Sequence, residues 1–159
     1  MKYFAIPALL LILLLAGCQT KPEEFTLVYT MESVGNYKIS IEIGKDKSYY
    51  IRQQNIFFDT FAGKERINSS QGKMTDEEFD QLSELVAGSR LFKMKDEYGF
   101  SQVDNPDNPY NGLVYQLIYT KGRKTKYISI RDNESELYPD IFLQLLRFLS
   151  NYVSEHSSS

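Results

Sequence analysis

The chain has 159 residues, a formal net charge of −3 and a single cysteine. This length suits one domain that buries a real hydrophobic core. The mild negative charge argues against a nucleic-acid partner, and a lone cysteine excludes a disulfide within the chain. The 12 tyrosines and 10 phenylalanines favour strands, and we expect most tyrosines to pack against a sheet.

The N-terminal residues have the pattern of a secretory signal peptide. Lys2 supplies a positive charge, residues 4–15 are apolar, and the small residues Ala16 and Gly17 follow. The apolar run of about 12 residues is shorter than the roughly 20 that a permanent membrane-spanning helix needs. We therefore expect this segment to be removed after export.

The sequence Leu15-Ala16-Gly17-Cys18 resembles the lipobox of bacterial lipoproteins at all four positions. The resemblance implies cleavage between Gly17 and Cys18, and lipid on the sulfur and new amine of Cys18. Two or three acyl chains give stable anchoring. The expected organisation is a signal peptide (1–17), a lipidated cysteine and tether (18–25), a single α+β domain (26–154) and a frayed polar tail (155–159).

The same resemblance implies a location in the cell envelope. Gln19 follows Cys18, so the aspartate that retains enterobacterial lipoproteins in the inner membrane is absent. We expect the outer membrane, on its periplasmic or its surface face. The expected partners are the membrane, through the N-terminal lipid, and a protein of the envelope, while the oligomeric state is left open.

Alternating apolar and polar residues predict several strands. The first three are expected over 26–32, 37–43 and 48–54, the last two of these forming a hairpin around the turn at 44–47. A second hairpin is predicted between 56–61 and 65–70. A third is predicted between 113–119 and 124–131, with the turn at 120–123.

Two amphipathic helices are predicted. Thr75 and Glu78 form a capping box at the start of a helix over 76–87, and Gly88 is the expected stop. A second helix is predicted after Pro139, where apolar residues recur at helical spacing. Together these elements predict an α+β fold: an antiparallel meander of β-hairpins with both helices packed on one face.

The stretch Met74-Thr75-Asp76-Glu77-Glu78-Phe79 resembles the helix start found in small Bacteroidetes-type lipoproteins of unknown function. That resemblance implies a similar order of strands and helices. It implies no catalytic residue.

Residues 95–112 form the longest stretch predicted to be irregular, and Asp104, Asp107 and Asn108 make it the most site-like one. Their carboxylate and amide oxygens can ligate Ca²⁺. An EF-hand loop starting at Asp104 places Pro109 where glycine is needed, so that motif does not fit. Turn formation by the Asx residues and prolines is the favoured interpretation.

A calcium site of another kind is left open at these positions. It would combine Asp104 and Asp107 with Asp96 and Glu97. No spacing in the sequence selects it.

The sequence offers few candidate residues for a zinc site or for a catalytic triad. Zinc sites and nucleophilic triads need histidine or cysteine, but the only histidine, His156, lies in the predicted tail. We assign no catalytic residue, no cofactor and no metal ligand. Lys121, Arg123, Lys124 and Lys126 make one hairpin basic, which favours a solvated sheet edge over a contact with anionic headgroups or a glycan.

The sequence thus predicts a non-enzymatic, lipid-anchored module for protein binding or assembly. The alternative is a lipoprotein that binds a small ligand or glycan through the 95–112 loop and exposed tyrosines. The direction of the tyrosines distinguishes the two: an aromatic cleft favours a ligand, and a flat apolar patch favours a protein.

Overall fold

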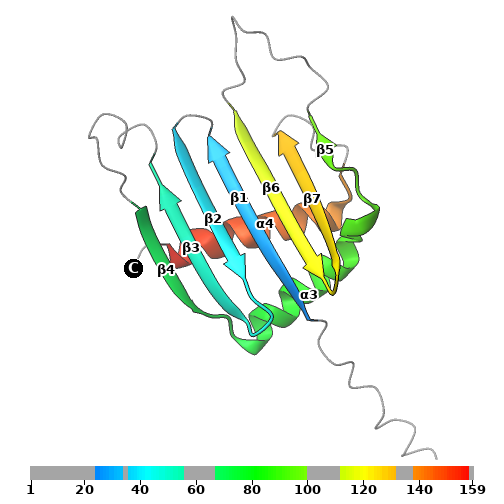
Figure 1. The fold of residues 1–159 in the computed structure, drawn as a ribbon, viewed down its shortest axis with the longest axis horizontal. Helices are drawn as coiled ribbons and strands as arrows, with labels where there is room; N and C mark the ends of the chain where they lie inside the picture. Colours follow the sequence, from blue (N-terminus) through cyan, green and yellow to red (C-terminus); the bar gives the residue numbers. More distant parts are fainter. Residues whose placement is uncertain (1–23, 34–35, 56–66, 100–111, 132–137, 158–159) are drawn as a thin grey trace, which may run out of the picture.

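The computed structural model describes residues 24–33, 36–55, 67–99, 112–131 and 138–157. A seven-stranded sheet packs one face against two helices, α3 (Asp76–Ser89) and α4 (Asp140–His156). Figure 1 shows both helices crossing behind the sheet, and no described element covers its other face. The predicted α+β class, with helices on one face, is confirmed.

The strand order across the sheet is β4-β3-β2-β1-β6-β7-β5. All neighbours are antiparallel except β5, which runs parallel to β7. The strands are β1 (Phe25–Ser33), β2 (Tyr37–Ile43), β3 (Ser48–Gln54), β4 (Ile67–Lys73), β5 (Glu97–Tyr98), β6 (Leu113–Lys121) and β7 (Lys124–Arg131). β1 lies at the centre and joins the N-terminal strands to the hairpin of β6 and β7.

The core lies between the sheet and the helices because the strands alternate. In β2, Ile39, Ile41 and Ile43 are buried while the residues between them are polar. Across this layer, Phe25 stacks on Phe79 of α3 at 5.4 Å between ring centroids, and the Tyr29 hydroxyl lies 2.7 Å from Ser150 Oγ of α4. The central strand therefore contacts both helices.

The capping box at the start of α3 is confirmed. The Glu78 amide donates to Thr75 Oγ1 at 3.2 Å, and the Thr75 amide donates to Glu78 Oε2 at 2.7 Å. The predicted stop at Gly88 is wrong, because α3 continues to Ser89 and ends at Arg90, whose φ of 50° is left-handed. A Cβ on Gly88 would lie 2.8 Å from Ile141 Cγ1, so this glycine permits the close approach of α4.

Other assignments also differ from the prediction. Phe25 belongs to β1 and the core rather than to the tether. α4 extends to His156, which was predicted to lie in the tail, and the imidazole ring of His156 stacks on Tyr152. The stretch predicted as irregular contains β5, which pairs with β7. β4 pairs with β3, while residues 56–66, which hold most of the predicted second hairpin, lie outside the described residues.

Candidate functional site

The residues that the sequence singles out for lipidation or ligand binding are Gly17, Cys18, Asp104, Asp107 and Asn108. All five lie outside the described residues. The signal cleavage site, the lipid site and the calcium loop therefore stay predictions.

Asp96, one of the carboxylates considered for calcium, has a structural role. Its side chain pairs with Lys126 Nζ, which also donates to the Met94 carbonyl at 2.6 Å. The Asp96 carbonyl accepts from the Ser129 amide at 2.8 Å. These contacts hold the chain before β5 against β7, so Lys126 is a partnered lysine and not part of a solvated basic edge.

The described residues offer little of the chemistry of an active site. Among them, no group of three or more His, Cys, Asp or Glu side chains is placed to hold a metal ion. His156 stacks on Tyr152 with 4.0 Å between ring centroids, and its Nδ1 lies 2.9 Å from the Tyr152 carbonyl. The imidazole is thus part of the packing at the end of α4.

Most of the described tyrosines belong to the core. Of the described tyrosines, only Tyr50 and Tyr127 lie on the sheet face directed away from the helices, and Tyr127 is 61% exposed. The prediction that most tyrosines are packed rather than exposed is confirmed for the other eight described tyrosines. Five are buried in the core: Tyr29, Tyr98, Tyr119, Tyr138 and Tyr152. Three are partly buried against it: Tyr37, Tyr49 and Tyr115. Two of them, Tyr115 and Tyr138, also line a hollow of about 310 Å³ beside α4.

The face directed away from α3 and α4, which we call the open face, carries a continuous row of side chains. Val28 of β1 lies opposite Ile118 of β6, and Ile118 lies opposite Tyr127 of β7. On the other side of Val28, the row continues through Glu42 and Tyr50. Because neighbouring strands are about 4.8 Å apart, these five strands span about 19 Å.

The row combines an apolar half and a polar half. Val28 and Ile118 are half-buried. Tyr50 and Glu42 border a hollow of about 490 Å³ that also reaches Val28. Hydrogen bonding to Ser69 and the nearby Arg52 guanidinium lower the pKa of Tyr50, and that guanidinium lies 5.6 Å from the ring centroid.

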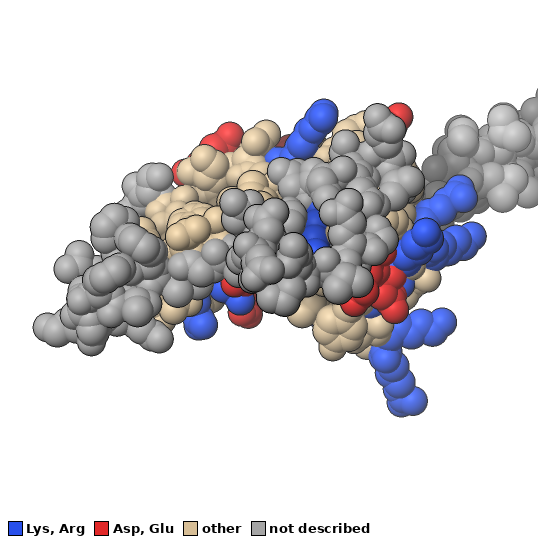
Figure 2. Space-filling view, turned by 90° about the horizontal axis from the view of Figure 1, so that it is seen from above, with Lys and Arg blue, Asp and Glu red and all other residues tan. Residues whose placement is uncertain are grey.

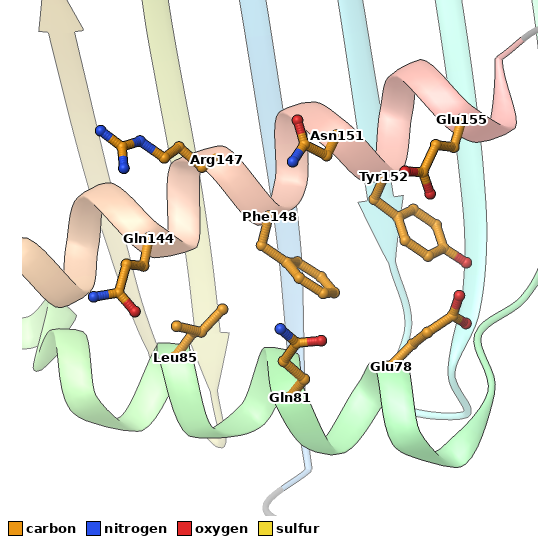
Figure 3. Close-up of a pocket in the computed structure, with 9 residues that line it drawn as sticks. All are labelled: Glu78, Gln81, Leu85, Gln144, Arg147, Phe148, Asn151, Tyr152 and Glu155. Carbon is orange, nitrogen blue, oxygen red and sulfur yellow. The ribbon is translucent and has the colours of Figure 1, made fainter.

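A second hollow, of about 420 Å³, lies between α3 and α4 on the outer surface of the helices. Figure 3 shows the side chains that line it, with Phe148 at its centre and Tyr152 between Glu78 and Glu155. The Tyr152 hydroxyl is buried and has no hydrogen-bond partner among the described residues. Its burial raises the pKa of Tyr152, with Glu78 acting in the same direction.

This groove offers amide and charged groups from Gln81, Gln144, Asn151 and Arg147. The buried hydroxyl of Tyr152, however, is closed off from the solvent that a ligand would replace. The groove is therefore a weaker candidate for recognition than the open face.

The sequence indicates the open face only in part. Alternation in each strand shows that one side is polar or mixed, but the row joins residues of strands that lie far apart in the chain, such as Val28 and Ile118. Only the order of the strands brings these residues together.

The chain was compared with protein-family models and with curated protein sequences, and neither comparison finds a match. Within the described part of the chain, neither α3 nor α4 has the length and apolar character needed to cross a membrane.

Proposed function

We propose that the chain is a lipid-anchored protein of the bacterial cell envelope, without enzymatic activity, whose open face binds another envelope protein. The lipid is attached at Cys18 after the signal peptide is removed, and the protein is held at the outer membrane. The match of Leu15 to Cys18 with the lipobox supports the anchor. The open face supports the binding role.

The observation that carries the binding role is the apolar half of the open-face row. Val28, Ile118 and Tyr127 are neighbours in register on three adjacent strands, and no described element covers them. A flat surface that combines an exposed aromatic ring with half-buried aliphatic side chains resembles the centre of a protein interface. Tyr50 and Glu42 extend it with hydrogen-bonding groups.

A small-ligand or glycan function has less support. It relied on exposed tyrosines beside the 95–112 loop, but only Tyr50 and Tyr127 of the described tyrosines lie outside the core.

The anchor is tested by replacing Cys18 with alanine in cells given an alkyne analogue of palmitate. We expect the native protein to incorporate the label and the Cys18→Ala variant to lose it and leave the membrane fraction. Equal labelling of the two proteins would contradict the anchor.

The binding role is tested with a photo-crosslinking amino acid at position 127 of the full chain in its native cells. A matched probe at Gln144, exposed on α4, is the control. We expect one discrete adduct from position 127, none from position 144, and loss of the adduct when Ile118 is changed to glutamate.

The other outcomes identify other functions. An adduct from position 144 alone would point to the helix groove and overturn the proposal. A crosslinked dimer of this chain would replace the envelope protein with a second copy.

A further inference from the structure

One end of the molecule gathers positive charge around an exposed aromatic ring. Arg90 and Lys93 flank Phe92, which is 43% exposed, and a hollow of about 560 Å³ joins these three residues to Lys121 and Lys124. Arg123 lies between the two lysines in the turn of the β6–β7 hairpin. We call these six residues the basic end. Figure 2 views the molecule from the other end of the strands and shows, at its right, protruding Lys and Arg side chains with a group of Asp and Glu side chains among them.

The fold brings two separate segments together to form the basic end. After α3, the left-handed Arg90 turns the chain into a short 3-10 helix, η1 (Leu91–Lys93), with Leu91 buried. Phe92 packs beside Tyr119 of β6, with 5.2 Å between ring centroids. This contact places η1 against the hairpin that carries the other three cations.

Four of the five positive charges of the basic end, all except that of Lys121, are not neutralised by an ion pair with another described residue. Lys121 and Lys124 lie directly opposite each other on β6 and β7, and like charges at such a position destabilise a sheet. Among the described residues, Arg90, Lys93, Arg123 and Lys124 form no ion pair. A cluster of this kind favours an anionic partner outside the chain.

The start of β1 lies at the same end. Phe25 is opposite Lys121 in the pairing of β1 with β6. In the sequence, Cys18 precedes Phe25 by seven residues, and seven residues span at most about 25 Å. A lipid on Cys18 therefore keeps the start of β1, which lies beside Lys121, within this distance of the membrane surface.

We propose that the basic end docks on an anionic phospholipid surface and orients the domain on the membrane. This inference rests on the proposed lipid anchor. Each Lys or Arg near an anionic bilayer raises membrane affinity on the order of fivefold, and an exposed phenylalanine inserts at the level of the headgroups. The lipid then supplies attachment, and the basic end supplies orientation.

The orientation has a consequence for the open face. The turn of the β6–β7 hairpin and the start of β1 lie at the same end of the sheet, which would face the bilayer. The strands would then run roughly perpendicular to the membrane plane, and the open face would be exposed in a direction parallel to the membrane. A partner on the open face would then approach along the membrane.

The test uses lipidated protein in vesicles, with the lipid on Cys18 first verified by mass. A fluorophore is placed on a cysteine introduced at Thr125, beside the basic end, or at Asn36, at the opposite end of the sheet. Vesicles contain phosphatidylcholine alone or with an equal part of phosphatidylglycerol, and a spin-labelled headgroup quenches fluorescence near the surface. The lipid-bearing sulfur of Cys18 does not react with the fluorophore.

We expect at least about a twofold stronger quenching at position 125 than at position 36 in the anionic vesicles. The difference should shrink in neutral vesicles and in about 1 M salt, where charges are screened beyond roughly 3 Å. Reversing Lys93, Arg123 and Lys124 to glutamate should abolish it. Reversing Lys38, Arg52 and Arg147, which changes the net charge equally, should not.

Equal quenching at the two positions, or quenching that does not depend on anionic lipid, would overturn the docking of the basic end while leaving the anchor intact. An unmodified Cys18 in the mass measurement would instead overturn the anchor. The two failures are therefore distinguishable.

Discussion

At the scale of single residues, two buried tyrosine hydroxyls contrast in their hydrogen bonding. The Tyr29 hydroxyl has Ser150 as partner at 2.7 Å, whereas the Tyr152 hydroxyl has no partner among the described residues. We expect Tyr29→Phe to lower the free energy of unfolding by about 1 kcal/mol, and Tyr152→Phe to leave it unchanged or raise it. Urea unfolding of both variants checks this, and an equal loss in both would contradict it.

Tyr152 also predicts a pH dependence. Its burial raises its pKa, so as pH rises above about 10 the unfolded chain releases this proton before the folded protein does. Stability that is present below this pH is then lost as pH increases. We expect the unfolding free energy of Tyr152→Phe to fall less steeply between about pH 9 and 11 than that of the native protein, and parallel curves would contradict this.

At the scale of elements, Gly88 sets the spacing between α3 and α4. Alanine in a helix is normally favoured over glycine by up to about 1 kcal/mol. A Cβ at Gly88 would nevertheless lie 2.8 Å from Ile141 Cγ1, closer than real Cβ contacts. We expect Gly88→Ala to destabilise the protein by about 1–3 kcal/mol, as measured by urea unfolding.

A double-mutant cycle separates this contact from helix propensity. In a background of Ile141→Ala, the change Gly88→Ala should cost little, because the opposing side chain is gone. The neighbouring exposed change Ala87→Gly measures propensity alone. Additive effects of the changes at positions 88 and 141 would show that the contact does not limit the helix spacing.

The elements that could be predicted from the sequence are those with local signals. The capping box at Thr75 and Glu78 marked the start of α3, and the alternation of isoleucines marked β2 with its bounds as observed. The end of α3 was missed because glycine serves there as a contact residue, while Arg90 takes the left-handed position. β5 was missed because a two-residue strand exists only through its partner β7.

At the scale of the whole molecule, the placement of both helices on one face was predictable, but the strand order was not. Hairpin signals are local, whereas the pairing of β1 with β6 joins distant segments through the match of their apolar faces. The open face and the basic end both depend on that pairing. Lys121 and Arg123 could be recognised in the sequence as part of a basic hairpin. Arg90 and Phe92 could not be assigned to the same surface, because only the fold brings their distant segment beside this hairpin.

Because the core lies on only one face of the sheet, two consecutive residues of β6 should differ in their contribution to stability. Leu117 is buried against the helices, and Ile118 is half-buried on the open face. We expect Leu117→Ala to lower the unfolding free energy by about 2–5 kcal/mol, and Ile118→Ala by about 1 kcal/mol or less.

Urea unfolding at low and high protein concentration checks this prediction and also bears on the occupant of the open face. If the face is free in the isolated protein, the small cost of Ile118→Ala does not change with concentration. A cost that grows with concentration would mean that Ile118 packs against a second copy, because dimer stability depends on protomer concentration. An equal loss in both variants at every concentration would contradict a core on one side of the sheet.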